Sequence, residues 1–147
     1  MGGNGSKAKG VLEDESSREY QTVFHVADNI IVVEAKKKSA MVKLPEESHT
    51  PNRIYVAVNK PPKNNSSTSD PYAGKLKSIA VYGNNCKKLY EIHVDHTHDG
   101  LPIHYHPWYD GKPIKAGSGK HSPSVAHELT AEMKELLNQI YNKVPHV

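Results

Sequence analysis

Short runs of apolar residues, separated by polar and turn-forming residues, fill the middle of the chain. Five of these runs have the length and the alternating or β-branched composition of strands, and they lie at residues 21–26, 30–35, 53–59, 76–82 and 88–94. The last two flank Gly83-Asn84-Asn85, a turn signal that predicts a β-hairpin. In the second strand of that hairpin, strict alternation puts Glu91 and His93 on one face and Ile92 on the other.

The final apolar pattern has the period of a helix. Thr130 is a suitable N-cap, Glu132 in the first turn suits the helix dipole, and Pro145 ends the helix. The apolar stripe consists of Met133, Leu136, Leu137, Ile140, Tyr141 and Val144. Together the elements predict an α+β domain, in which an antiparallel sheet of five or six strands has the C-terminal helix packed on one face.

Composition limits the organisation of the chain and its compartment. Residues 1–19 are rich in glycine, serine and charge and predict a flexible arm, and residues 20–147 are long enough for a single domain. The mean hydropathy is −0.68, no apolar run has the length of a membrane span, and no leader is recognisable, so we expect a cytoplasmic protein. The single cysteine, Cys86, excludes an internal disulfide framework and a cysteine-based zinc cluster.

The charge balance is mildly basic. The net charge is +3 with neutral histidines, and the pI is about 8.8, which is below the value above about 9 that is typical of a nucleic-acid-binding module. A polyanionic partner such as RNA, DNA or an acidic protein is therefore compatible with the sequence but is not required by it.

The residues best suited to catalysis or metal binding are concentrated between His93 and Gly111, where five of the ten histidines accompany the only tryptophan. His96 with His98, and His104 with His106, are pairs spaced two residues apart, and in an extended chain each pair points to one face. If the residues between the pairs form a bend, four imidazoles converge on one patch. The candidate site residues are His93, His96, His98, His104 and His106, together with His49 from a loop that Pro45 and Pro51 stiffen.

Three interpretations of this cluster stay open. In the first, His104 and His106 act as general acid and base on a phosphodiester without any cofactor. Neighbouring residues then contact the nucleic acid, and the candidates for charge or stacking are Arg53, Lys87, Lys88, Trp108 and Lys120. In the second, zinc or another divalent metal is bound by His96, His98, His104 and His106, with Asp95 or Asp99 as a ligand or as an orienting group. In the third, the histidines are structural.

The segment LKSIAVYGNNCKKLYEIHVD, followed by HYHPWYDG, carries a resemblance to known families. It resembles small phage- and prophage-encoded proteins and the C-terminal domains of polymorphic toxins of the barnase, EndoU, colicin and RelE-like ribonuclease group, over roughly residues 40–144. The resemblance implies a small curved antiparallel sheet and metal-independent RNA cleavage by in-line attack of the 2′-hydroxyl. It implies His104 and His106 as the acid and base, assisted by His93, His96 or His98 and by His49.

On this basis we expect a phage- or mobile-element-encoded ribonuclease in the cytoplasm of a bacterial host cell, with a role in counter-defence. Its expected partner is RNA or a host nuclease–RNA complex rather than a membrane, and a homodimer is compatible with the sequence. Two alternatives are a non-enzymatic inhibitor of a host nuclease, of the anti-CRISPR kind, and a histidine-ligated metal hydrolase. The chain has more histidines than acid–base catalysis needs, which favours a metal or leaves several of them without a role.

Overall fold

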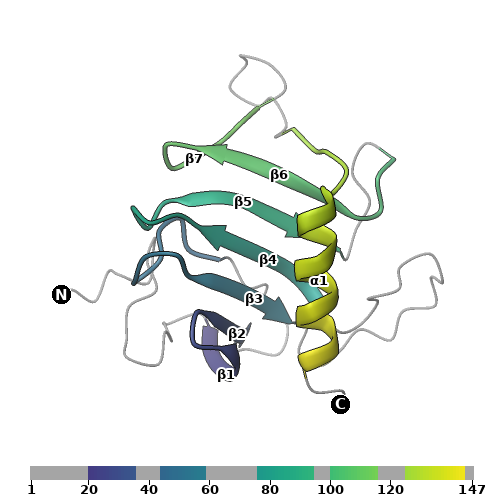
Figure 1. Ribbon diagram of the computed structural model, residues 1–147. Helices are drawn as coiled ribbons and strands as arrows, with labels where there is room; N and C mark the ends of the chain where they lie inside the picture. The colour runs from purple at the N-terminus through teal and green to yellow at the C-terminus, as the bar shows by residue number, and fades with distance from the viewer. Residues whose placement is uncertain (1–19, 36–43, 59–75, 95–99, 116–124, 145–147) are drawn as a thin grey trace.

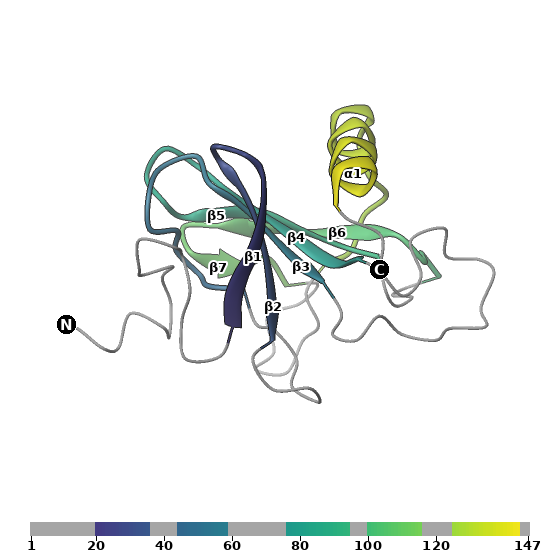
Figure 2. The same ribbon diagram turned by 90° about the horizontal axis from the view of Figure 1, so that it is seen from below.

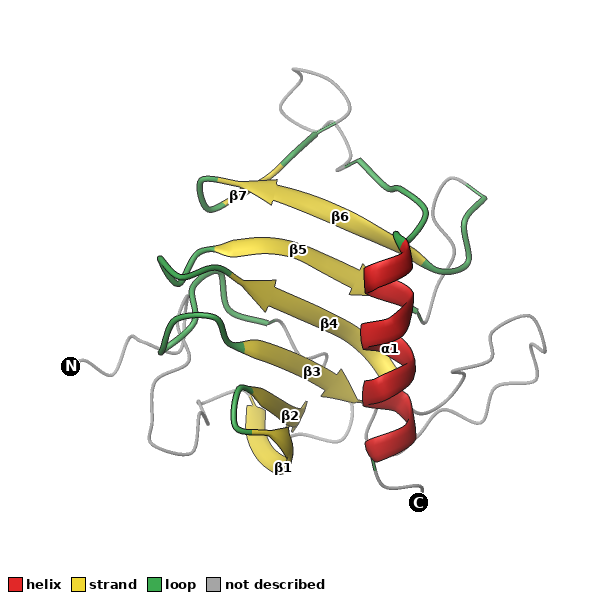
Figure 3. Cartoon of the chain, viewed as in Figure 1, coloured by secondary structure: helices red, strands yellow, loops and turns green. Residues whose placement is uncertain are grey.

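The computed structural model describes residues 20–35, 44–58, 76–94, 100–115 and 125–144 (Figure 1). Within them one sheet contains seven strands in chain order, and one helix follows (Figure 3). The elements are β1 (Tyr20–Ala27), β2 (Ile30–Ala35), β3 (Ile54–Val58), β4 (Leu76–Tyr82), β5 (Lys88–His93), β6 (His104–Tyr109), β7 (Lys112–Pro113) and α1 (Ala131–Lys143). The α+β class is confirmed, and the sheet has more strands than the five or six predicted. The predicted arm, residues 1–19, lies outside the described residues.

The sheet is not wholly antiparallel, so this part of the prediction was wrong. β2 and β3 run parallel, with Ile30 opposite Ile54, while the other neighbouring strands pair antiparallel. A parallel pair needs a connection of a dozen or more residues, and residues 36–53 supply one. The four residues Ile30–Val33 are all buried, as expected for a strand that is covered on both faces.

The helix and the predicted hairpin form as the sequence indicates. The hydroxyl of Thr130 accepts a hydrogen bond from the Met133 amide at 3.2 Å, so Thr130 caps α1. α1 lies on one face of the sheet (Figure 2), where Leu137 and Ile140 join the core cluster that includes Ile79 and Ile92. β4 and β5 pair as a hairpin with Ile79 opposite Ile92.

The sheet face opposite the helix has a second core, built around tyrosines. Tyr20, Tyr55 and Tyr82 are buried there, and the rings of Tyr55 and Tyr82 meet edge to face with centroids 5.2 Å apart. Because side chains alternate along each strand, Glu91 and His93 of β5 continue this face beyond the tyrosines. The candidate site therefore lies on the side of the sheet that α1 does not cover.

Candidate metal centre

Three histidines from two neighbouring strands converge on this face. His93 of β5 stands directly opposite His104 of β6, and His106 follows two residues later on the same side. The ring centroids lie 4.8 Å apart for His93 and His106, 4.8 Å for His104 and His106, and 5.4 Å for His93 and His104. Antiparallel pairing and alternation are thus sufficient to assemble the cluster.

The three histidines differ in burial. His104 is completely buried and His106 is 7% exposed, whereas the side chain of His93 keeps 22% of its surface exposed. Each residue offers one ring nitrogen that lies within 4.8 Å of a ring nitrogen of the other two. His93 is therefore the most exposed of the three histidines.

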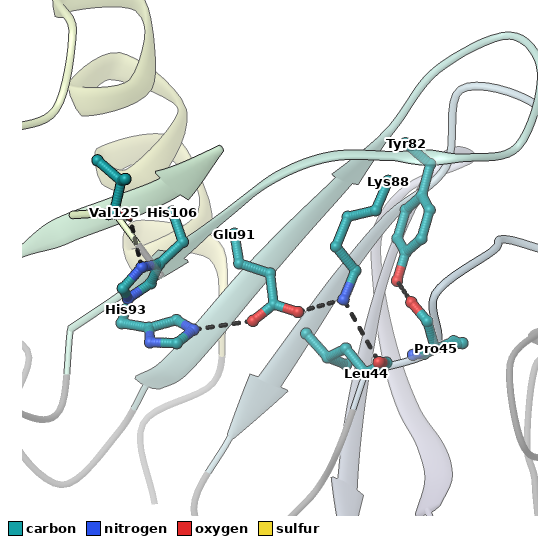
Figure 4. A network of polar contacts seen from close by, with 8 residues as sticks. All are labelled: Leu44, Pro45, Tyr82, Lys88, Glu91, His93, His106 and Val125. Carbon is teal, nitrogen blue, oxygen red and sulfur yellow. Dashed lines mark hydrogen bonds and ion pairs between the residues drawn. The ribbon is translucent and has the colours of Figure 1, made fainter. Parts of the chain in front are cut away.

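Backbone carbonyls orient the two rings of β6. The Nδ1 atom of His104 donates to the carbonyl of Leu101 at 3.1 Å. The Nδ1 atom of His106 donates to the carbonyl of Val125 at 2.8 Å (Figure 4). A carbonyl oxygen can only accept, so in each ring the proton must be on Nδ1. In the neutral ring Nε2 then carries the lone pair that can bind a metal.

A carboxylate orients the third ring. The Nε2 atom of His93 donates to Oε1 of Glu91 at 2.8 Å, and the other carboxylate oxygen of Glu91 accepts from the ammonium of Lys88 (Figure 4). Burial by itself would raise the pKa of Glu91, but the hydrogen bond from His93 and the charge of Lys88 outweigh it and lower the pKa to about 2. Glu91 is therefore an anion at neutral pH, and in neutral His93 the lone pair is on Nδ1.

Lys88 is held in the interior rather than offered to solvent. Its side chain is 1% exposed, and its ammonium lies 4.1 Å from the centroid of the Trp108 ring and 3.5 Å from the carbonyl of Leu44. Lys88, Glu91 and His93 thus form a continuous polar chain that ends at the histidine cluster (Figure 4).

The remaining cationic candidates do not gather around the cluster. The guanidinium of Arg53 donates to the carbonyl of Asp28 at 2.7 Å, and the Arg53 carbonyl bonds to Tyr82 at the end of the β4–β5 hairpin far from His93. Lys87 forms an exposed ion pair with Asp110 at 2.7 Å. Lys120 lies outside the described residues.

The histidine candidates divide into three groups. His93, His104 and His106 come together, as the spacing of His104 and His106 predicts. His49 is exposed in a loop whose residue Ser48 bonds to Cys86, next to the start of β5, so the structure does not bring His49 to the cluster. The other candidate ligands lie outside the described residues, and these are Asp95, His96, His98 and Asp99.

From the sequence, Lys88 is predicted only as a nucleic-acid contact and Glu91 only as a neighbour on the same face, so the support that both give to His93 was missed. Alternation already places Glu91 on the face of His93, and a carboxylate two residues before a histidine in a strand is the available signal. Lys88 gives no such signal, because it reaches this face through a register shift between Val81 and Tyr82, where Lys88 pairs with Tyr82.

The donor set fits a divalent metal ion of the zinc type. Histidine ligands commonly donate their second ring N–H to a carboxylate or a backbone carbonyl, and all three histidines here do so. Zinc–nitrogen bonds of about 2.1 Å require nitrogens about 3.4 Å apart. Because the present separations are at most 4.8 Å, the nitrogens must approach one another by no more than about 1.4 Å. Three protein ligands with room for a water are typical of catalytic rather than structural zinc.

Comparison of the chain with protein-family models, with curated proteins and with solved structures finds no match. The resemblance to toxin domains stays a prediction. Among the described residues there is no helix of sufficient length and apolarity to cross a membrane.

Proposed function

We propose that the chain is a metal-dependent hydrolase whose centre is formed by His93, His104 and His106. The observation that carries this proposal is the orientation of the three rings. Each ring is oriented through one nitrogen by an oxygen acceptor, and one ring nitrogen of each histidine lies within 4.8 Å of those of the other two. The ion proposed is zinc or a similar divalent metal, since imidazole is a suitable ligand for these metals.

The chemistry follows from the charge of the ligands. Three neutral imidazoles leave a divalent ion its full charge, and such an ion lowers the pKa of a bound water to about 7. In hydrolysis the water oxygen adds to the electrophilic phosphorus, the bond to the leaving oxygen breaks, and the proton of the water passes to that oxygen. The protein fixes the three rings on two strands, and His93 is the most exposed of the three.

The geometry favours this mechanism over the metal-free acid–base pair. A general acid and a general base must each reach the reacting group at about 2.6–3.2 Å from opposite sides. The rings of His104 and His106 have centroids 4.8 Å apart, which leaves no room for a phosphate between them. The Nδ1 atom of each ring is also committed to a backbone carbonyl.

RNA is the proposed substrate, as the basic balance of the chain and the resemblance to ribonuclease domains suggest. The product chemistry tests this choice, because metal-assisted attack by water gives a phosphate monoester end, whereas attack by the 2′-hydroxyl gives a cyclic phosphate.

Metal binding is tested by titrating untagged protein with Zn²⁺ or Co²⁺ in a calorimeter. We expect one ion per chain in the wild type and a loss of at least about 100-fold in affinity in His106→Ala, which lacks one of three ligands. His25→Ala is the matched control, because His25 is an exposed histidine on β1. Unchanged affinity in His106→Ala would place any ion elsewhere and refute the centre.

Hydrolysis is tested on a fluorogenic RNA in the presence and absence of a chelator. We expect cleavage that the chelator abolishes, that added Zn²⁺ or Mn²⁺ restores, and that is absent from His106→Ala but retained by His25→Ala. Cleavage that persists in the chelator would support the acid–base mechanism instead. One bound ion without cleavage of RNA would refute the proposed substrate while leaving the metal centre intact.

A further inference from the structure

We infer that Lys88 sets the charge of the centre so that the open position of a bound ion takes an anionic oxygen ligand, such as the non-bridging oxygen of a phosphodiester. This inference rests on the proposed metal centre and adds the class of ligand and the residue that selects it. It is carried by the polar chain from Lys88 through Glu91 to His93.

The charges along this chain can be followed group by group. As metal ligands the three rings would each be neutral, because an imidazole binds a metal through the lone pair of an unprotonated nitrogen. Glu91, which is bonded to His93, contributes one negative charge, and Lys88, which is bonded to Glu91, contributes one positive charge. Ser78, which stands opposite His93 on β4, is uncharged. A divalent ion added to this set leaves a net charge of +2 around the open position.

Without Lys88 the same centre would carry a net charge of +1. Many metal-ligating histidines are oriented by a carboxylate, whose charge offsets part of the charge of the ion. Here the carboxylate is itself neutralised by an ammonium that is 1% exposed and is held between Trp108 and the carbonyl of Leu44. Because the ammonium is buried, solvent screens its field less than it screens the field of a surface lysine such as Lys87.

The role of Lys88 is that of a positioning residue, since it acts through Glu91 and His93 and does not touch the substrate. A neutral ligand would gain nothing from the extra charge, whereas an anionic ligand gains a Coulomb attraction. The expected effect on the affinity for an anion is about five- to tenfold for one unit charge, given an effective dielectric constant of about 25–35 and a separation of about 10 Å.

The experiment uses the Co²⁺-loaded protein at saturating metal and constant ionic strength. Changes in the visible absorption bands of Co²⁺ report the binding of dimethyl phosphate, an anionic diester, and of trimethyl phosphate, its neutral analogue. The variants are Lys88→Met, which lowers the local charge by one, Glu91→Gln, which raises it by one, and the double variant, which restores it. Lys87→Met is the control, because Lys87 is a neighbouring lysine paired at the surface with Asp110.

We expect the affinity for dimethyl phosphate to fall about five- to tenfold in Lys88→Met, to rise by a similar factor in Glu91→Gln, and to return to the wild-type value in the double variant. Trimethyl phosphate should bind weakly and equally to all of them. A role in folding alone cannot produce the rise in Glu91→Gln, so that variant decides the question even if Lys88→Met does not fold.

Equal affinities for dimethyl phosphate in all folded variants would overturn the inference while leaving the metal centre standing. Lower affinity in all three variants would also overturn it, because the effect would then follow structural damage rather than charge. If Co²⁺ gives no visible bands with the wild-type protein, the proposed metal centre itself fails.

Discussion

The contribution of the buried ion pair between Lys88 and Glu91 to the stability of the domain can be measured by removing one of the two charges. Lys88→Met keeps the unbranched side chain that fills the space beside Trp108 and removes only the charge and its hydrogen bonds. The pair is almost fully enclosed, since the side chains of Lys88 and Glu91 are 1% and 16% exposed. The substitution therefore leaves a buried carboxylate with one remaining hydrogen-bond donor among the described residues, the ring of His93.

The magnitude follows from that enclosure. Breaking a buried pair by removing one partner typically costs about 3–5 kcal/mol. The shift in the pKa of Glu91 from 4.5 to about 2 corresponds to about 3 kcal/mol of stabilisation of the ionised form, shared between Lys88 and His93. Since a domain is stable by only about 5–15 kcal/mol, Lys88→Met should lose about a fifth of that stability or more.

Urea unfolding in the presence of a chelator measures the change. Trp108 is the only tryptophan in the chain, and it lies against the ammonium of Lys88, so its fluorescence reports on this region while circular dichroism reports on the whole fold. We expect the midpoint of unfolding to fall by about 1–3 M urea for a typical dependence on denaturant. The double variant with Glu91→Gln should recover most of the loss, because neither charge is then left alone.

Lys87→Met is the matched control, and its exposed pair with Asp110 should leave the midpoint almost unchanged. The reasoning is refuted if Lys88→Met unfolds at the same urea concentration as the wild type, or if the double variant is less stable than Lys88→Met alone.

Two further predictions follow from the same structure. The pKa of Glu91 is lower in the folded chain than the ordinary value of 4.5, so its contribution of about 3 kcal/mol to the stability is present in full above about pH 5 and is lost as the pH falls towards 2. Unfolding of the metal-free protein at a series of pH values should show this loss of stability. A Glu91→Gln variant whose stability falls equally steeply with pH would contradict the prediction. Leu137→Ala should destabilise the domain by about 2–5 kcal/mol, because Leu137 is 1% exposed in the core between α1 and the sheet, whereas Glu135→Ala on the exposed side of α1 should change the unfolding midpoint very little.

Local patterns predicted the elements that depend on local physics. The alternation of β4 and β5, the turn between them and the capped stripe of α1 each specify an element without reference to distant residues. The parallel pairing of β2 with β3 was not predictable in this way. The direction of β3 relative to β2 depends on the connection of 18 residues, 36–53, and the sequences of the two strands alone do not specify it.

The candidate site was only partly predictable, because one part of it depends on local spacing and the other part on the pairing of strands. The spacing of His104 and His106 places both on one face of a strand, and the structure confirms that placement. The third member, His93, depends on the register between β5 and β6, which sets His93 opposite His104. The contribution of Lys88 depends on a register shift in β4 and β5, a tertiary feature that no spacing in the sequence reports.

Because of the position of β6 in the sheet, an ion bound at this centre would also stabilise the pairing of two strands. On one side β6 pairs with β5 over four residue pairs, and on the other side it has the two residue pairs of β7 and an isolated bridge between Tyr105 and His127. A metal ion shared by His93, His104 and His106 would join β5 to β6 by bonds that do not depend on the backbone ladder. Amide hydrogens along β6 should then exchange more slowly once the ion is bound, and withdrawal of the ion should let this margin of the sheet fray before the rest.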